Sequence, residues 1–560
     1  MSWRSRNLPK TCSKSSTNQI ESSTAAKMDT QGRLSPRTDA IIQQACDVYF
    51  RHSHNKPYAF FNEEVFHRRL ALNQIPLYLR LAVIATAARY TSLSQWKERK
   101  QRTIDEYVRY SWSLILAMPD TPENTANVAL VQALALLAIL DTTAGRRRSA
   151  WLKIGMAVRI SQDLRMTLEP TLELSVAERD ERRRLFWSLF LLDRFICCSF
   201  HRPSAIKDAD CHLGLPADDG LDMLSLPVTL KSLLDKRTRS RSLQPGIFGL
   251  SVGLSAVLGH TIDEMMNKEP GMEDEPWLPD SPYSSINRDL EFLRELASRH
   301  GSVLTALRQH PLDGTQGRDG ERTAQMVLIY TLYHLNHCLL SHPLLLGSKI
   351  ELLQPKVPLS WMKEAQARCF THARSLTTLL INAKAAGYMP VPSFYSYCIL
   401  VAGTILALHA CSDEVVPHQE SEGYLQSSLT YLGEVSELWE NAHIMATALR
   451  SFIARSARYS DILLQDQPHI QSLGHEEFII LRSVIDYWAM MDPRDPFSSL
   501  NPNRDPSAIS PEGSSGSSKP GDDTINPHTL FQHAGLSPMP SEHGESLIQW
   551  DWDGESTMDA

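Results

Sequence analysis

The sequence predicts an all-α protein in which one large multi-helix domain, residues 39–491, lies between two tails. Apolar residues recur at three- and four-residue spacing along 39–491, and alternating runs bounded by hairpin turns are few. The 560 residues are 42% hydrophobic and 21% charged, which is a globular composition with enough length to bury a large core. We therefore expect helices packed against helices, with no need for a sheet.

Helical periodicity identifies a series of segments separated by connectors that contain proline and glycine. They are 37–52, 65–72, 78–92, 100–117, 124–141, 150–164, 178–200, 286–308, 323–341, 362–385, 393–411, 427–443 and 475–489.

Two stretches, 128–140 and 394–411, are apolar on every side. The second has no formal charge over about the length of a membrane-spanning helix, but it contains Ser396, Thr404 and His409 and lacks a flanking Lys/Arg cluster. A helix without a polar face is also expected where other helices surround it. We therefore interpret both as central helices of a folded core and predict no membrane association.

The two tails differ in charge. Residues 1–38 form a Ser/Thr-rich, disordered basic tail in which seven Lys and Arg oppose two acidic residues. It lacks the apolar core of a secretory signal and is interpreted as a nuclear-import or DNA-contacting arm, a mitochondrial transit peptide or a merely solvated tail. Residues 492–540 form a Pro/Ser/Gly-rich disordered linker.

Residues 541–560 combine six acidic residues and no Lys or Arg with bulky apolar side chains. Acidic residues keep such a segment exposed, while the apolar side chains remain available to a groove on a partner. The segment is therefore a candidate activation segment that would contact the transcription machinery, and the alternative is a solubilising tail. The candidate residues are Leu547, Ile548, Trp550 and Trp552.

The net charge and the cysteines exclude several classes of protein. At a net charge of -8 the whole chain is repelled by nucleic acid, so DNA contact requires a local basic patch or a partner. The nine cysteines include no C-x-x-C pair and show no paired spacing, which fits reduced thiols and predicts no disulfide framework.

Motifs for catalysis and metal binding are weak. Residues 249–253, GLSVG, match the G-x-S-x-G nucleophile elbow, but the preceding residues are basic and broken by Pro245 where an elbow needs a buried strand. His334 and His337 lie one helical turn apart without an acidic or cysteine companion nearby, so they are interpreted as core histidines. We therefore predict no enzyme activity, no catalytic residue, no cofactor and no metal ligand within this chain.

The most informative stretch is 150–216, which contains AWLKIGMAVRISQDL and then ERRRLFWSLFLLDRFICCSFHRPSAIKDADCHLGLP. It resembles the middle homology region of fungal-specific transcription factors, the zinc-cluster regulators, with weaker similarity over roughly 40–490. The resemblance rests on a W-x-x-x-G-x-A-x-R helix, an R-R-x-F-W-x-L-x-x-x-D-R helix and an R-P-x-x-I-x-D-x-D loop. The motif residues are Trp151, Gly155, Arg159, Arg183, Arg184, Phe186, Trp187, Asp193, Arg194, Arg202, Pro203, Asp208 and Asp210.

Physical chemistry assigns structural roles to these motif residues. Leu185, Leu189 and the apolar residues one turn further form a wide apolar helix face. Gly155 is expected to let another helix approach closely. Asp193 and Arg194 are candidates for fixing the end of their helix and the following loop, and Arg202 for pairing with Asp208 or Asp210.

The chain departs from the family pattern at three places. The family usually has glycine where His201 stands, and L-G-L-H where this chain reads Leu164-Arg165-Met166-Thr167. It also has an N-terminal cluster of six cysteines, which places a helix in the DNA major groove, whereas only Cys12 lies in that region here. Zinc is therefore expected only if such a cluster precedes this sequence.

The resemblance implies a nuclear transcription regulator that controls a metabolic or secondary-metabolite biosynthetic gene set. Its partners would be promoter DNA, directly if a zinc cluster exists and otherwise through a partner protein, together with a small-molecule effector. The alternative is a non-DNA-binding helical scaffold or a ligand-sensing interaction protein derived from that family.

Overall fold

In the computed structural model, the described residues run from 36 to 491 with short gaps. They are 36–90, 97–119, 121, 127–218, 227–235, 237, 240, 242–267, 275–309, 318–351, 353, 356–388, 393–411, 418–466 and 468–491. Residues 44–516 form one compact unit, and residues 1–43 with 517–560 are assigned to a second. Residues 1–35 of the basic tail, the linker 492–540 and the acidic segment 541–560, with its apolar residues Leu547, Ile548, Trp550 and Trp552, lie outside the described residues.

The described part of the chain is helical, as the sequence predicts, and its one β pairing is an isolated bridge between Gly214 and Thr229. The helices are α1 (Pro36–His52), α2 (Glu63–Ala71), α3 (Leu77–Ala87), η1 (Ala88–Tyr90), α4 (Lys97–Leu116), α6 (Val128–Thr143), α7 (Arg147–Asp163), α8 (Val176–Ile196), η3 (Asp208–Asp210), α9 (Leu230–Leu234), α10 (Ile247–Ile262), η4 (Asp263–Asn267), α11 (Pro282–Ser298), α12 (Val303–Gln309), α13 (Arg318–Leu340), α14 (Pro343–Glu351), α15 (Leu359–Ala385), α16 (Phe394–Ala410), α17 (His418–Val435), α18 (Glu440–Ile453), α19 (Ser456–Leu463), η5 (Ile470–Ser472) and α20 (His475–Ile485).

Local signals in the sequence explain several helix starts. Asn127 caps α6, where its Oδ1 accepts a hydrogen bond from the backbone N of Leu130 at 2.8 Å. At the start of α8 the Ser175 hydroxyl accepts from the backbone N of Glu178, and the Glu178 carboxylate accepts from the backbone N of Ser175. This reciprocal capping box gives α8 a defined first turn, although its first residues are largely polar.

Two predicted helices have the wrong bounds. The predicted helix 286–308 is two helices, α11 and α12, because Gly301 adopts a φ of +100° between them. The predicted helix 427–443 joins the end of α17 to the start of α18 across Leu438 and Trp439, where neither glycine nor proline marks the break. The prediction also omitted α9, α10, α14 and α19.

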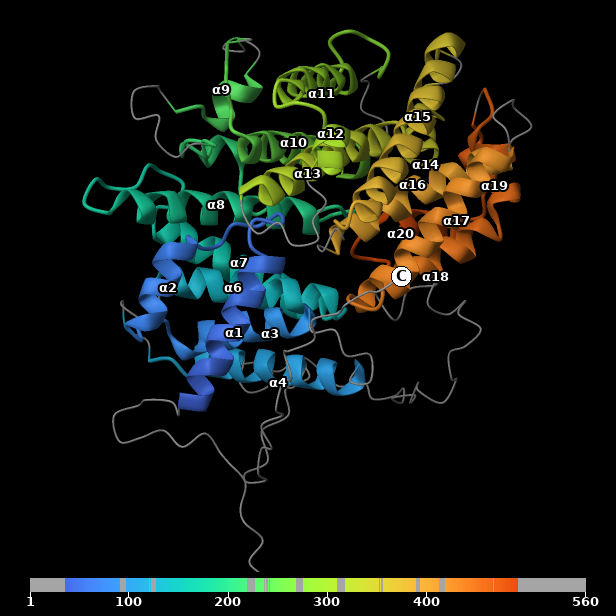
Figure 1. Ribbon diagram of the computed structural model, residues 1–560. Coiled ribbons are helices and arrows are strands. Elements are labelled where there is room, and N and C mark those ends of the chain that lie inside the picture. Colours follow the sequence, from blue (N-terminus) through green and yellow to red (C-terminus); the bar gives the residue numbers. More distant parts are fainter. Residues whose placement is uncertain are drawn as a thin grey trace, which may run out of the picture. The chain divides into compact units, whose positions relative to one another are not determined.

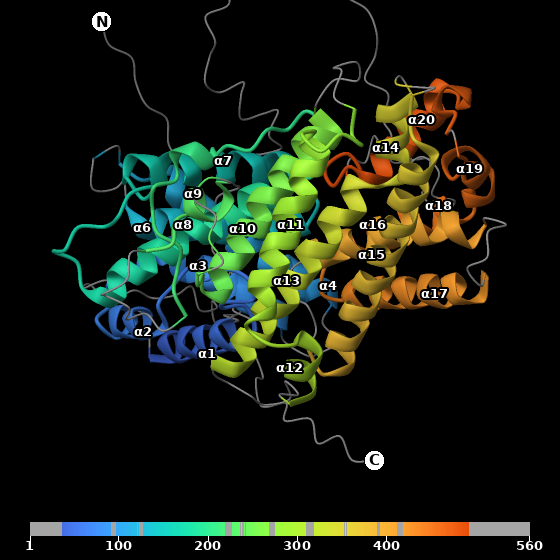
Figure 2. The same ribbon diagram turned by 90° about the horizontal axis from the view of Figure 1, so that it is seen from above.

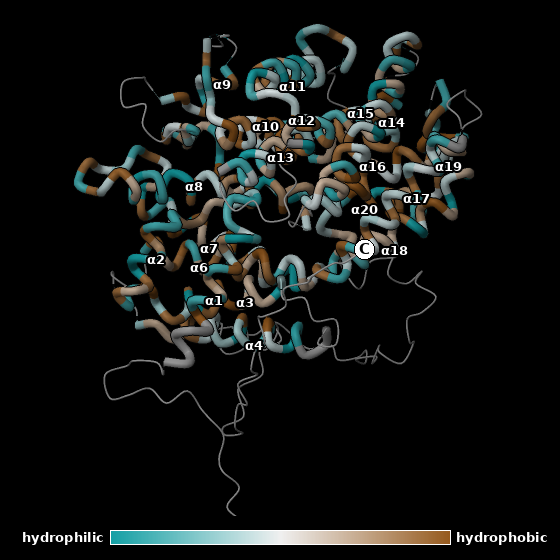
Figure 3. The backbone as a smooth tube through the Cα atoms, in the orientation of Figure 1, coloured by the Kyte–Doolittle hydropathy of each residue, from teal (hydrophilic) through white to brown (hydrophobic). Residues whose placement is uncertain are grey.

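Three helices, α6, α10 and α16, are buried on almost every side. In α16 all residues except His409 are buried, and α15, α17, α18 and α13 pack around it. Figure 3 contrasts the hydrophobic α10 with the largely hydrophilic outward turns of α11. The residues 394–411 therefore form a core helix, and no helix among the described residues is long and apolar enough to cross a membrane.

Helix α10 occupies its central position because it contains closely packed glycines. A Cβ atom on Gly253 would lie 2.7 Å from Cδ2 of Leu233 and 3.3 Å from Cδ2 of Leu293. The GLSVG stretch is thus helical and buried, and Ser251 donates to Ile247 O and to the side-chain oxygen of Gln325. The motif has no strand before it, so it is not a nucleophile elbow.

Helix α8 lies between α6 and α7 on one side and α10 on the other (Figure 1). Figure 2 shows α10 and α13 side by side, with α15 and α16 next to them toward the C-terminal helices. Every residue from Leu185 to Ile196 is buried, so the second half of α8 is enclosed on all sides and not only on the expected apolar face. The helix therefore carries its charged residues into the core.

Replacing Gly253 with valine is expected to lower the free energy of unfolding by about 1–3 kcal/mol, because the added carbons must displace Leu233 and Leu293. Gly155→Ala in α7 is the matched control, since no heavy atom lies within 4 Å of a Cβ at that position. It should raise the free energy of unfolding by up to about 1 kcal/mol through helix propensity. Chemical denaturation measures both, and an unchanged Gly253→Val midpoint would contradict this packing of α10.

Candidate functional site

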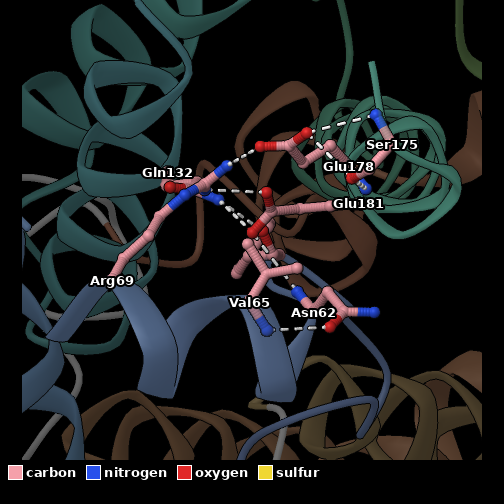
Figure 4. A network of polar contacts seen from close by, with 8 residues as sticks. Asn62, Val65, Arg69, Gln132, Ser175, Glu178 and Glu181 are labelled. Carbon is pink, nitrogen blue, oxygen red and sulfur yellow. Dashed lines mark hydrogen bonds and ion pairs between the residues drawn. The ribbon is translucent and has the colours of Figure 1, made fainter. Parts of the chain in front are cut away.

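The start of α8 is joined to α2 and α6 by a buried carboxylate (Figure 4). Glu181 accepts hydrogen bonds from Arg69 at 2.9 Å, from the backbone N of Asn62 at 3.3 Å and from Gln132 at 3.4 Å. Burial raises the pKa of Glu181, and the Arg69 charge and these donors partly offset that effect. Glu181 thus ties the start of α8 to the aromatic loop, residues 57–62.

The middle of α8 holds the aromatic loop a second time. Ser188 accepts a hydrogen bond from the backbone N of Ala59 at 2.8 Å, and Gln132 of α6 donates to the carbonyl of Phe60 at 2.8 Å. Backbone groups of an irregular segment need such partners when they are buried. The loop therefore presents Tyr58 and Phe60 to the interior in a fixed position.

At its end, α8 carries the adjacent buried charges Asp193 and Arg194, which are 1% and 2% exposed. Asp193 accepts hydrogen bonds from the backbone N of Ala205 at 3.1 Å and of Ile206 at 3.0 Å. Arg194 donates to Asp193 at 2.9 Å and to the carbonyl of Ile206 at 2.7 Å. Both side chains therefore bind the backbone of the loop that follows α8.

A second carboxylate extends this pair toward the surface. Arg194 also donates to Asp208 at 2.6 Å, and the other oxygen of Asp208 lies 2.9 Å from Nε2 of His260. Burial alone would raise the pKa of Asp208, but the His260 hydrogen bond and the Arg194 charge hold it below its usual value. The guanidinium also packs over the ring of Phe190 at 4.1 Å.

The expected pairing of Arg202 with Asp208 or Asp210 is wrong. The Arg202 guanidinium lies 4.8 Å from the ring centroid of Trp151 and 4.4 Å from that of Trp488. Asp208 forms its ion pair with Arg194 instead. Planar guanidinium groups stack favourably on indole rings. Trp488 reaches Arg202 only because the chain returns to this loop after α20, which sequence spacing does not show.

Asp486 holds that returning segment in place. Its carboxylate accepts from the Ser199 hydroxyl at 2.6 Å and from the backbone N of Phe200 at 3.0 Å. It also accepts from the backbone N of Trp488 at 2.9 Å and of Ala489 at 2.7 Å. The sequence analysis did not single out Asp486, which falls inside the predicted helix 475–489, whereas α20 ends at Ile485.

The other motif residues divide into core, bridging and exposed positions. Phe186 and Trp187 are fully buried, and the indole of Trp187 donates to the carbonyl of Gly214 at 2.9 Å. The expected role of Gly155 in close helix packing is wrong, because nothing lies near it. Arg183 pairs with Glu169 and Arg184 with Asp180, whereas Arg159, Pro203 and Asp210 are exposed.

Two departures from the family pattern coincide with left-handed backbone. Arg165 has a φ of +52° and His201 a φ of +58°, the region that glycine adopts most readily. These are the two positions where the resemblance implies glycine. The chain retains the turn at both positions and accepts the steric cost of a side chain there.

An apolar cavity of about 60 Å³ adjoins α8. Leu192, Phe195 and Ile196 of α8 form one wall. The other walls come from α1, Ser53, Lys56, the aromatic loop, α3, η1, α6, the start of α16, Trp439 and Tyr487. The volume exceeds that of a single water molecule. The cavity therefore lies where segments from both ends of the compact unit meet.

Histidines of α13 and α15 gather in a largely buried group, of which the sequence analysis named His334 and His337 but not His372. Nδ1 of His334 lies 2.8 Å from Nδ1 of His372, and the rings of His337 and His372 stack at 4.0 Å. Contrary to the prediction, an acidic side chain is near, since Glu291 lies 3.9 Å from Nε2 of His337. Burial lowers the pKa of His334 to about 3 and of His372 to about 4.

Metal coordination finds no support among the residues that the structure describes. No group of three or more His, Cys, Asp or Glu side chains there has the geometry to hold a metal ion. The cysteines described are free thiols, and burial raises the pKa of Cys46 and Cys211 to about 12. These residues do not fit the paired zinc ions of a six-cysteine cluster, which needs thiolates.

Residues 46–294 are similar to the family described as the fungal specific transcription factor domain. The Zn(2)-C6 fungal-type transcription factors FTF1c and FTF1a of Fusarium oxysporum f. sp. lycopersici are each 21% identical over 463 residues, 78% of this chain. An uncharacterized transcriptional regulatory protein of Schizosaccharomyces pombe is 25% identical over 311 residues, 51% of this chain and 31% of that protein. The chain spans 48% of FTF1c and 41% of FTF1a, less than half of each.

Replacing Asp193 with asparagine is expected to lower the free energy of unfolding by about 3–5 kcal/mol, because the Arg194 charge then stays buried without its adjacent carboxylate. Arg159→Ala is the control, since Arg159 is exposed and donates a hydrogen bond to Gln162. It should change stability by less than about 0.5 kcal/mol. Equal denaturation midpoints for the two variants would contradict a structural role for the pair.

Introducing glycine at Arg165 or His201 is expected to raise the free energy of unfolding by up to about 1 kcal/mol each, because the left-handed backbone no longer opposes a Cβ atom. The reverse change, Gly145→Ala at a φ of +71°, should lower it by a similar amount. Differential scanning calorimetry tests all three, and a loss of stability in both glycine variants would refute the interpretation.

Proposed function

We propose that this chain, whose residues 46–294 form a fungal-specific transcription factor domain, is a nuclear regulator that controls a metabolic or secondary-metabolite biosynthetic gene set. The chain is a distant homologue of Zn(2)-C6 fungal-type transcription factors, and its family is one of transcription factors and not of enzymes. The observation that carries the proposal is that the family domain contains α8 with its buried Asp193–Arg194 pair and the loop that the pair holds.

Contact with promoter DNA is proposed to be indirect unless a six-cysteine cluster precedes this sequence. The relatives are named for such a cluster, and the chain spans less than half of FTF1c and FTF1a. The net charge of -8 also supports indirect contact, because a chain with this charge is repelled by the polyanionic DNA. Promoter DNA would then be reached through an added zinc module or a partner protein.

Activation is proposed to come from residues 541–560. Their six acidic residues and the side chains of Leu547, Ile548, Trp550 and Trp552 suit a groove on the transcription machinery. A solubilising tail is the competing assignment.

A second candidate, a ligand-sensing scaffold, is favoured by the cavity beside α8. Its walls come from segments far apart in the sequence, so a bound molecule would stabilise their packing together. This candidate shares the helical domain with the first and differs from it in needing no promoter.

Deleting the gene is expected to change the transcript levels of a limited, co-regulated gene set, and the tagged protein should be recovered by chromatin immunoprecipitation at those promoters. Unchanged transcript profiles would contradict the proposal of a transcription regulator and would favour the ligand-sensing scaffold.

Residues 541–560 tethered to an unrelated DNA-binding domain should activate a reporter. Replacing Trp550 and Trp552 with serine should abolish that activation, whereas serine at Thr557 should not.

A further inference from the structure

Helix α7 leaves one of its long faces uncovered. The helix packs against α6 and contacts α8, and its buried residues include Lys153, Ile154, Ala157 and Val158. The opposite face, which we call the α7 stripe, consists of Arg148, Leu152, Gly155, Met156, Arg159 and Asp163. These positions follow one another at intervals of four, three, one, three and four residues, so they lie on one side of the helix. Every residue of the stripe except Gly155 is exposed.

The middle of the α7 stripe is apolar and open. Leu152 is 62% exposed and Met156 is 37% exposed, and they lie one helical turn apart. No heavy atom lies within 4 Å of a Cβ atom placed on Gly155 between them. Covering two neighbouring apolar side chains is favourable, and glycine offers the room for another helix to do so.

The ends of the α7 stripe carry charges that oppose the helix macrodipole. Arg148 lies in the first turn of α7, and Asp163 is its last residue. A helix has partial positive charge at its start and partial negative charge at its end, so both residues stand where the opposite charge would be more stable. Neither side chain forms a hydrogen bond or an ion pair with a residue inside the described ranges. A partner with a carboxylate at one end and a guanidinium at the other would compensate both charges.

A second copy of α7 is such a partner. The intervals of the stripe are the same in either direction, so a two-fold axis through its middle lays a second α7 antiparallel on the first. Arg148 then lies opposite Asp163 of the second copy, and symmetry forms this pair twice. Antiparallel helices also bring opposite ends of their macrodipoles together. Charges that are unfavourable within one chain are therefore neutralised between two chains.

We propose that the protein forms a symmetric homodimer through the α7 stripe. In the same arrangement Met156 fills the open space over Gly155 of the second copy, and Leu152 packs on the aliphatic part of Arg159. A helix of 17 residues is about 25 Å long and about 10 Å wide, so one helix pair buries well under the roughly 1,200 Å² of a stable interface. The dimer is therefore weak and reversible. This inference concerns assembly and does not rest on the proposed function.

Sedimentation equilibrium of the purified full chain tests the proposal. The protein is expected to shift from monomer to dimer as its concentration rises to about 100 µM. Arg148→Glu alone and Asp163→Arg alone should each weaken the dimer about five- to tenfold, because each replaces two attractions with two repulsions. The double variant should restore the affinity to within about twofold, because the exchanged charges again face each other. Both substitutions place charges that suit the macrodipole of α7, so the single variants should remain folded.

A matched pair of lysine substitutions tests the apolar middle of the stripe. Leu152→Lys should weaken the dimer at least tenfold, because it removes an apolar contact and faces Arg159 of the second copy. Leu172→Lys is the control, since Leu172 is 86% exposed but lies outside α7, and it should leave the affinity unchanged. Circular dichroism should show the same helix content in all variants.

Three results would overturn the proposal. The first is a monomer throughout the concentration range, and the second is a dimer that Arg148→Glu and Leu152→Lys leave intact, which would place the interface elsewhere. The third is a double variant that associates no better than the two single variants, because the proposed charge pairs would then not exist.

Discussion

The buried guanidinium of Arg194 constrains the centre of this domain more than any other single group. An unpaired charge in a helical core costs several kcal/mol, so the surrounding chain must supply acceptors. Asp193, the carbonyl of Ile206 and Asp208 supply them, and Asp193 in turn accepts two backbone N–H groups. The conformation of the loop after α8 therefore depends on neutralising the Arg194 charge as much as on the loop's own sequence.

Helix α8 links these polar contacts to the apolar interior. Glu181 near its start and Ser188 in its middle hold the aromatic loop, and its last turns form one wall of the cavity. The wall of the cavity and the anchor of the loop after α8 therefore belong to the same helix.

The return of the chain after α20 closes the arrangement. Asp486 caps the segment that carries Trp488, and Trp488 packs edge-to-face against Trp151 while the guanidinium of Arg202 lies over its ring. Tyr487, the neighbour of Trp488, lines the cavity together with Tyr49 of α1. Residues near 490 therefore pack against the segment 46–294, which matches the family, and the similarity to FTF1c covers 78% of this chain.

The sequence by itself determined the helical class, the central position of α16 and the resemblance to fungal-specific transcription factors, because helical periodicity, uniform apolar runs and the 150–216 motifs are local properties. It did not reveal α10 as a helix, since a glycine-rich apolar run shows no amphipathic period, and it did not break 427–443 at Trp439. Only the tertiary structure decided that Arg194 and not Arg202 binds Asp208, that Gly253 and not Gly155 packs closely, and that Trp439 lines the same cavity as Tyr49. Each of these depends on which distant segments meet, and that choice follows from burying charge and apolar surface over the whole domain at once.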